Sequence, residues 1–342
     1  GEWKRPVWAP EWVPDRVFKL TPLEQVAVGL PLYVLHLLVF SKKSWKLDAP
    51  IIPNDKGVFS VIGMDSIAGI AMLVFMAVIR LRSGLKAAPD VLKAGPEGVP
   101  WGIVAKEVRR KVLPTTFFLV LAYLASGYGA MVCEQVLIIM STLGVPVTIP
   151  TMRAWKVLIG HLMWVFMGVR ILMSRLKPFF PPEGKWLQCK WNDNWVWWAT
   201  GGFYVSAFLF NCADVVNQFI LPSSAFNDEG VVSKLINPEN KDLVAMAVGS
   251  IGPCMSAPIF EEVLYRGFLL PALTCFLPLY VAIPLSSVLF AVHHLNLSGI
   301  IPLTVLGFAW AVIYTQSKNL LVTILIHAMW NSRVFLGSFI GL

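Results

Sequence analysis

The chain is 342 residues long, 56% of its residues are hydrophobic, only 14% are charged, and its mean hydropathy is +0.67. Soluble domains carry roughly 25% charged residues, so this composition excludes an ordinary soluble protein. The net charge is +8, but the Lys and Arg residues cluster in loops between apolar segments, which favours lipid headgroups over nucleic acid as their anionic partner.

The apolar segments predict an all-α protein, a polytopic bundle of roughly eight or nine transmembrane helices, because about 20 apolar residues in a helix span a bilayer. Before the first span, residues 1–21 combine Trp, Pro and charged side chains, which is typical of an amphipathic segment at the headgroups. A basic loop at residues 80–111 separates the second and third spans. The predicted spans cover residues 23–40, 58–79, 113–140, 154–173, 194–221, 243–260, 268–295, 300–314 and 320–340.

Isolated polar residues in these spans are predicted to stabilise the helix packing. His36 and His161 are lone histidines within apolar segments, and each is predicted to form a hydrogen bond between helices rather than to act in catalysis. The five cysteines are scattered and form no CxxC pair, so the sequence indicates neither a disulfide framework nor a thiolate zinc site.

Polar and ionisable side chains inside apolar segments are concentrated in the last third of the chain. Such groups are costly in a membrane and by default mark function. They lie in the segments FEEVLYRG, LFAVHHLN and IHAMWN, and they are Glu261, Glu262, Arg266, His293, His294, His327 and Asn331. The sequence therefore predicts a reactive site there, against the alternative of a buried ion-pair network that only locks helices together.

Helical spacing distinguishes the two carboxylates. Glu262 and Arg266 are four residues apart and can form an ion pair on one helix face. This leaves Glu261, rotated by about 100° around the helix, as the candidate reactive carboxylate. Because the preceding span is predicted to end at residue 260, Glu261 is expected close to the end of that helix.

The other polar residues are placed by the same spacing. His327 and Asn331 are four residues apart and share a helix face. Phe290 and His294 also share a face, whereas His293 points elsewhere. The carboxylate and one imidazole could polarise a water molecule, while the other imidazole and the asparagine amide could stabilise an oxyanion. Together these groups could hydrolyse a peptide bond, so the sequence predicts a peptidase.

In their order and spacing, the three segments resemble the EExxxR, FxxxH and HxxxN motifs of the CPBP family, the CAAX protease and bacteriocin-processing enzymes also called Abi proteins. The resemblance covers about residues 243–342 and implies a glutamate-dependent intramembrane endopeptidase. By position it implies that Glu261 is the catalytic glutamate and that His294 binds the water with it. It also implies that His327 and Asn331 stabilise the oxyanion, and that the supporting residues are Glu262, Arg266 and Phe290.

The sequence leaves a metal ion open. It has no HExxH zinc helix, but Glu261, His294 and His327 could hold zinc, since carboxylate and imidazole both ligate this metal. The asparagine fits an oxyanion role better than a ligand role, so the first expectation is that there is no cofactor and zinc is the alternative. The GxSG and GxGD motifs of other intramembrane proteases are absent.

Two functions follow from the resemblance. In the first, residues 243–342 are a catalytic core that cleaves a membrane protein or a lipidated peptide; prenylated CAAX tails are the best-known substrates of the family. In the second, the chain is a non-proteolytic scaffold or chaperone whose N-terminal helices, residues 1–242, bind partner membrane proteins. A transporter is a weaker alternative that rests on charges embedded in the first half, which are Asp65, Glu134, Arg170 and Asp214.

The resemblance also bears on location. Extended chains of this kind are similar to plant and algal plastid members of the family, some of which are thought to act in pigment or photosystem biogenesis. The chain begins at Gly1 without an initiator methionine, as a processed chain would. Both features favour a plastid membrane, either thylakoid or envelope, as the expected location of this multi-pass protein.

Overall fold

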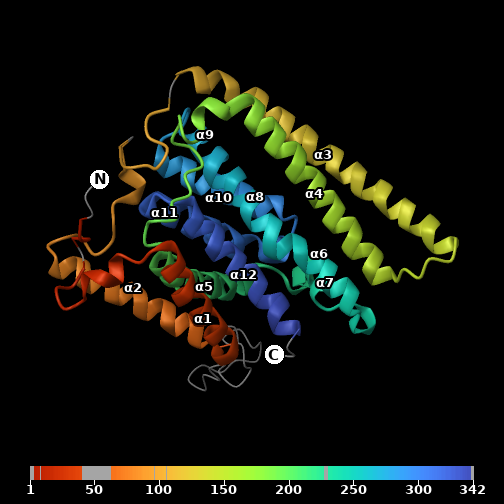
Figure 1. Ribbon diagram of the computed structural model, residues 1–342, viewed down its shortest axis with the longest axis horizontal. Helices are drawn as coiled ribbons and strands as arrows, with labels where there is room; N and C mark the ends of the chain where they lie inside the picture. The colour runs from red at the N-terminus through yellow and green to blue at the C-terminus, as the bar shows by residue number, and fades with distance from the viewer. Residues whose placement is uncertain are drawn as a thin grey trace. The chain divides into compact units, whose positions relative to one another are not determined.

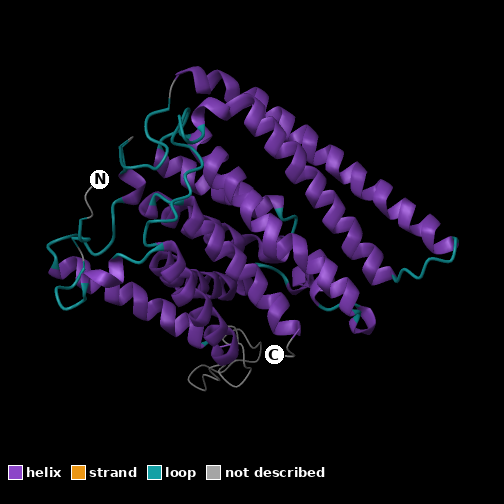
Figure 2. Cartoon of the chain, viewed as in Figure 1, coloured by secondary structure: helices purple, strands orange, loops and turns teal. Residues whose placement is uncertain are grey.

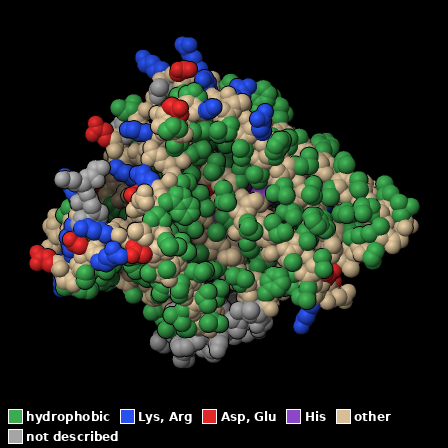
Figure 3. Space-filling view, viewed as in Figure 1, with side chains coloured by type: hydrophobic (Ala, Val, Ile, Leu, Met, Phe, Trp, Pro, Cys, Tyr) green, Lys and Arg blue, Asp and Glu red, His purple; other side chains and the backbone are tan. Residues whose placement is uncertain are grey.

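The computed structural model describes residues 4–7, 9–40, 63–95, 97–104, 106–226 and 230–339. Over these residues the chain forms helices and loops and no β-strand (Figures 1 and 2). Eight of these helices are long and apolar enough to cross a membrane, which confirms the predicted polytopic all-α bundle. Hydrophobic side chains are spread over the face that Figure 3 displays, as expected of a surface that contacts lipid.

The α-helices differ from the predicted spans chiefly in the last third of the chain. Their bounds are α1 Pro22–Phe40, α2 Met64–Arg82, α3 Lys106–Thr142, α4 Ile149–Leu176, α5 Trp195–Ile220, α6 Val231–Ile236, α7 Leu243–Ile251, α8 Ala257–Glu262, α9 Leu270–Leu273, α10 Leu279–His293, α11 Ile300–Ser317 and α12 Leu320–Phe339. Helices α7, α8 and α9 join into one candidate span, Leu243–Leu273. The predicted break between residues 260 and 268 is therefore wrong, and the helix breaks between α9 and α10 instead.

Parts of several predicted features lie outside the described residues. These parts are residues 1–3 and 8 of the amphipathic segment, 58–62 of the second span, 96 and 105 of the basic loop, and 340 of the last span. The described remainder of the amphipathic segment contains one short 3-10 helix, Asp15–Phe18.

By their internal contacts the helices fall into two compact units that alternate along the chain. Unit 1 comprises Gly1–Pro100, Cys189–Phe226 and Pro278–Ile326, and unit 2 comprises Trp101–Gln188, Asn227–Leu277 and His327–Leu342. The motif residues are divided between them. Phe290, His293 and His294 belong to unit 1, whereas both glutamates, Arg266, His327 and Asn331 belong to unit 2. The proposed domain boundary between residues 242 and 243 stays a prediction.

In unit 1, small and polar residues let helices approach closely. A Cβ atom on Gly69 of α2 would lie 2.1 Å from the backbone oxygen of Tyr204 in α5, so only glycine fits there. A Cβ atom on Gly307 of α11 would lie 3.0 Å from the ring of Phe290 in α10. Nδ1 of His36 lies 3.0 Å from the hydroxyl group of Tyr204, which confirms His36 as an interhelical hydrogen-bonding residue.

In unit 2, α3 and α4 lie side by side as a long hairpin (Figure 1). Glu134 of α3 forms an ion pair with Lys156 of α4 at 2.6 Å, so this embedded charge holds two helices together. A Cβ atom on Gly160 of α4 would lie only 2.8 Å from the Cβ atom of Ala130, which shows how closely the two helices approach.

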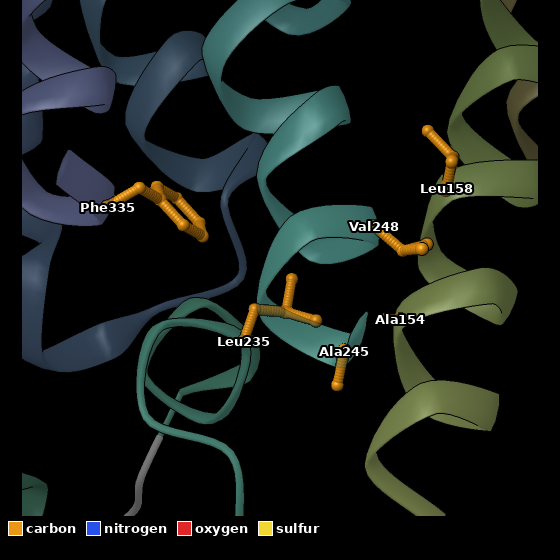
Figure 4. Packing of buried hydrophobic residues seen from close by; sticks show 6 residues of the cluster. All are labelled: Ala154, Leu158, Leu235, Ala245, Val248 and Phe335. Carbon is orange, nitrogen blue, oxygen red and sulfur yellow. The ribbon is translucent and has the colours of Figure 1, made fainter. Parts of the chain in front are cut away.

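Apolar side chains from three other helices of unit 2 form a buried cluster with α7. The cluster, shown in Figure 4, consists of Ala154 and Leu158 from α4, Leu235 from α6, Ala245 and Val248 from α7, and Phe335 from α12. Through this cluster the helix that carries the glutamates packs against α4 and α12, the helix that carries the last motif.

Two glycines provide a test of this packing. A Cβ atom on Gly168 of α4 would lie 2.5 Å from Cζ of the buried Phe260. We expect Gly168→Ala to destabilise the protein by about 1–3 kcal/mol, because overpacking forces a buried side chain to move. Gly252→Ala is the matched control, since its Cβ atom would lie 3.8 Å or more from its neighbours. Thermal unfolding in detergent measures both variants, and equal unfolding midpoints would contradict this packing.

Asp242 caps the N-terminus of α7 and links it to the start of α4. Its carboxylate accepts hydrogen bonds from the backbone N–H groups of Val244 and Ala245, both at 3.0 Å, and from the hydroxyl groups of Thr148 and Thr151. The hydrogen bond from Thr148, and then the one from Ala245, hold the pKa of the Asp242 carboxyl below its usual value of 3.8. The folded protein therefore favours the charged form.

This cap makes stability depend on pH. A carboxyl group with a lowered pKa contributes stability that is fully present above its unfolded-state pKa and is lost as the pH falls through its folded-state pKa. We expect Asp242→Ala to lower the unfolding temperature at pH 7, and the difference from the wild type to shrink below about pH 4. Thermal scans from pH 3 to pH 7 measure this difference. Glu239→Ala, in an exposed ion pair with Arg153, is the control, and a difference that does not change with pH would contradict the role of Asp242.

Candidate active site

Glu261 and Glu262 lie within a continuous 31-residue helix, Leu243–Leu273. The prediction that Glu261 lies close to a helix end is therefore wrong. The charged motif interrupts the apolar pattern and so resembles a boundary, but Glu262 is neutralised by partners inside the protein, which lets the helix continue through the membrane. The break comes after Leu273, and Pro278 then begins α10 as its N-cap.

Two π-helical stretches flank the glutamates. Gly252–Ser256 lies between α7 and α8, and Val263–Leu269 lies between α8 and α9. A π-turn holds one more residue than an α-turn and so changes which side chains share a face, and such turns are frequent at functional sites. Their position on both sides of Glu261 and Glu262 marks this part of the helix as the candidate site.

Glu262 is the centre of a fully buried network. Its Oε1 atom lies 3.1 Å from Nη1 of Arg266 and 2.9 Å from Nδ1 of His327. The side chain of Glu262 is 0% exposed, and those of Arg266 and His327 are each 3% exposed. The ion pair that the spacing predicted is present, and a histidine from α12 joins it. Because this second partner comes from another helix, the spacing within one helix held no signal for it.

His327 connects the two glutamates. While Nδ1 hydrogen-bonds to Glu262, Nε2 lies 3.7 Å from Oε2 of Glu261. The Glu261 side chain is 13% exposed, so it is more accessible than that of Glu262. One imidazole therefore faces a buried structural carboxylate on one side and a more accessible carboxylate on the other.

Asn331 binds the backbone of the helix that carries the glutamates. Its Nδ2 atom donates a hydrogen bond to the carbonyl oxygen of Pro253 at 2.8 Å. The N–H group of Ala257 donates to Gly252, five residues earlier. In the same pattern the donor to Pro253 would be residue 258, which is a proline and has no N–H group. The asparagine amide supplies this missing donor, a role that the HxxxN spacing did not predict.

Phe290 and His294 share a face in unit 1, as their spacing predicts. Nδ1 of His294 lies 2.7 Å from the carbonyl oxygen of Phe290, and the two rings pack edge-on with centroids 4.7 Å apart. Nδ1–H is therefore the donor in this hydrogen bond. His294 follows the last residue of α10 and is exposed, while the adjacent His293 is partly buried. The role of His294 beside Glu261 stays a prediction.

The predicted zinc ligands do not form a recognisable metal site. Across the residues that the structure describes, no group of three His, Cys, Asp or Glu side chains is arranged to hold a metal ion. Nδ1 of His327 bonds to the carboxylate of Glu262, an arrangement that zinc-bound histidines also show. Because His294 belongs to unit 1 and Glu261 and His327 belong to unit 2, the zinc set stays a prediction, and the reaction is derived below from the side chains alone.

The segment that carries the glutamates and the last motif is matched by a model of a known family. The match covers residues 243–333, and the model describes "Type II CAAX prenyl endopeptidase Rce1-like" proteins. This segment is therefore similar to the Rce1-like endopeptidases. The family resemblance that the three motifs indicated is thereby confirmed over these residues, while residues 1–242 lie outside the match.

A curated bacterial protein supports the same relationship. It is named "Putative membrane peptidase YdiL", comes from Bacillus subtilis (strain 168), and is 26% identical over 139 residues. These residues are 40% of this chain and 54% of the bacterial protein, so the match spans about half the length of that relative. No solved structure matches the chain.

Proposed function

We propose that the protein is an intramembrane peptidase of the CAAX-protease type, in which Glu261 activates the water that attacks a peptide bond. The observation that carries this proposal is the position of Glu261 beside the buried network of Glu262, Arg266 and His327, within a membrane helix of the Rce1-like segment. The buried network joins two helices, and the carboxylate of Glu261 beside it is the more accessible of the two.

In the proposed reaction, Glu261 takes a proton from water while the water oxygen bonds to the carbonyl carbon of the substrate. His294 binds the same water through Nε2, because its Nδ1–H is engaged by Phe290. The proton then passes from Glu261 to the nitrogen of the leaving amine. The peptide bond breaks, and the carboxylate of Glu261 is regenerated.

The network supplies the charge that the reaction needs. Arg266 places a positive charge beside the carboxylate of Glu262 in this buried site. In the proposed oxyanion role, His327 donates from both ring nitrogens, with Nδ1–H directed to Glu262 and Nε2–H to the oxyanion. Asn331 uses one amide hydrogen for Pro253, and its second hydrogen is the other donor to the oxyanion.

The substrate, core and location follow from the same proposal. Residues 243–342 form the catalytic core, and the substrate is a membrane protein or lipidated peptide that is cleaved near the membrane surface. We place the protein in a plastid membrane, thylakoid or envelope, on the family resemblance. Fractionation of plastids with an antibody to the protein tests this location, and recovery outside the plastid would contradict it.

Expression of the wild type and Glu261→Ala in the native membrane tests the peptidase function. We expect an uncleaved precursor to accumulate with Glu261→Ala and not with the wild type. His36→Ala is the matched control, since it removes a buried histidine that bonds to Tyr204 in unit 1. Membrane proteomes that are identical for the wild type and Glu261→Ala would contradict the proposal.

A second function is favoured by the length of the chain outside the family match. Residues 1–242 lie beyond it, and they could bind partner membrane proteins in a scaffold or chaperone that does not cleave them. Rescue of a null mutant distinguishes the two functions. If Glu261→Ala rescues every defect as fully as the wild type, the scaffold accounts for the function. If only the wild type rescues, the peptidase does.

A further inference from the structure

A third histidine, His161 of α4, lies on the face of α4 that packs against the glutamate-bearing helix. Leu158, three residues before it, belongs to the buried cluster that includes Val248 (Figure 4). Trp164, three residues after it, packs edge-on against Phe260 with ring centroids 4.8 Å apart. Residues three apart lie on the same side of a helix, so His161 is directed at the glutamate-bearing helix between these two contacts.

The imidazole of His161 lies over Gly252, the first residue of the first π-helical stretch. A Cβ atom on Gly252 would be 3.8 Å from Cδ2 of His161. The next residue, Pro253, offers the carbonyl oxygen to which Asn331 is bonded. A side chain from α4 and one from α12 therefore approach the same π-helical stretch.

The buried nitrogen of His161 faces no protein partner. Nε2 is inaccessible to solvent and forms no hydrogen bond with any residue of the described part of the chain. The imidazole lies between Gly252 and Phe260 of the glutamate-bearing helix, and Phe260 directly precedes Glu261. The prediction that His161 forms an interhelical hydrogen bond is therefore wrong for this nitrogen. Because buried polar atoms almost always have a partner, Nε2 calls for a small polar molecule beside Glu261.

We infer that His161 is a further residue of the active site and that its Nε2–H donates a hydrogen bond to the water that Glu261 activates. The inference rests on the proposed peptidase function. The two hydrogens of the water are directed to Glu261 and to Nε2 of His294, and one lone pair accepts from His161. This leaves one lone pair for attack on the carbonyl carbon, and three partners suit a buried water.

Two substitutions of His161 test this role. His161→Phe keeps a planar ring and removes both nitrogens, whereas His161→Gln restores a side-chain N–H donor. With purified protein and the precursor that accumulates in Glu261→Ala membranes, we expect His161→Phe to lower kcat on the order of 100-fold, as misplacement of a reacting group does. KM should stay within about twofold, because the lost hydrogen bond is to water and not to substrate.

The controls separate this inference from the function on which it rests. His161→Gln should regain part of the kcat, and His36→Phe should leave kcat unchanged. If His161→Phe leaves kcat unchanged while Glu261→Gln abolishes cleavage, the peptidase function stands and the role of His161 fails. A rise in KM alone would also overturn it, since His161 would then bind the substrate. If Glu261→Gln cleaves as the wild type does, the peptidase function itself fails.

A readout that needs no substrate tests the placement of His161. Unfolding midpoints are compared for His161→Phe, Glu261→Gln and the double variant in detergent. Because the two side chains share one water molecule in this proposal, we expect their effects to be non-additive. Additive effects would overturn the placement of His161 beside Glu261, whatever the outcome of the activity assays.

Discussion

Replacement of Glu262 by alanine is expected to destabilise the protein by about 3–5 kcal/mol, because it leaves two buried partners without their carboxylate. Arg266 would keep a full positive charge at a site where its side chain is 3% exposed, and His327 would lose the acceptor of its Nδ1–H. Neither group could recover solvation from water without opening the helix packing. The effect should therefore exceed that of nearly every surface substitution.

Unfolding of the purified protein in detergent measures this effect. Glu107→Ala is the matched control, since Glu107 also pairs with a basic residue four positions away but is 73% exposed, and it should cost less than about 1 kcal/mol. A double variant, Glu262→Leu with Arg266→Met, removes both charges and should regain much of the lost stability. Equal losses for Glu262→Ala and Glu107→Ala would show that Glu262 is not the centre of a buried network.

Glu261→Gln is expected to lower kcat by about 10²–10⁴-fold with little change in stability. Glutamine has nearly the size of glutamate and can keep its hydrogen bonds, but it cannot take a proton from water, and general base catalysis contributes this much. Stability should change little because the amide keeps the size of the side chain and can still form hydrogen bonds.

Cleavage of the accumulated precursor by protein reconstituted in liposomes measures kcat. Glu261→Asp keeps the carboxylate but withdraws it by one methylene group, so its activity should fall between that of the wild type and that of Glu261→Gln. Unfolding midpoints of the same preparations show whether the fold is intact. A variant Glu261→Gln that is folded and fully active would rule out the carboxylate as the base.

These two predictions assign opposite tasks to neighbouring carboxylates. Loss of Glu262 should affect stability first, and loss of Glu261 should affect rate first. The separation arises because Arg266, one helical turn onward, forms a buried ion pair with Glu262. Helical spacing in the sequence predicts the same division of roles between Glu261 and Glu262.

Local spacing in the sequence predicted some features of the site but not others. The ion pair of Glu262 with Arg266 and the shared face of Phe290 and His294 were predictable, because each depends on one turn of one helix. The continuation of the helix past Glu261 was not predictable in this way. Charged residues within an apolar segment indicate a boundary unless their partners are known.

Links between helices were outside the reach of a single sequence. His327 bonds to Glu262 over a separation of 65 residues, and Asn331 bonds to Pro253 over 78 residues. No periodic pattern connects positions so far apart. The only local signal for the second link was the pair of prolines five residues apart, Pro253 and Pro258, which leaves one carbonyl oxygen without its helical donor.

The sequence by itself determined the membrane class, the all-α fold and the three motifs, because composition and the period of the α-helix are properties of neighbouring residues. Only the tertiary structure decided that His327 lies between Glu261 and Glu262 and that His161 lies over Gly252. Both facts depend on which helix faces meet. In a chain that is apolar on nearly all sides of its helices, hydrophobic periodicity does not reveal those faces.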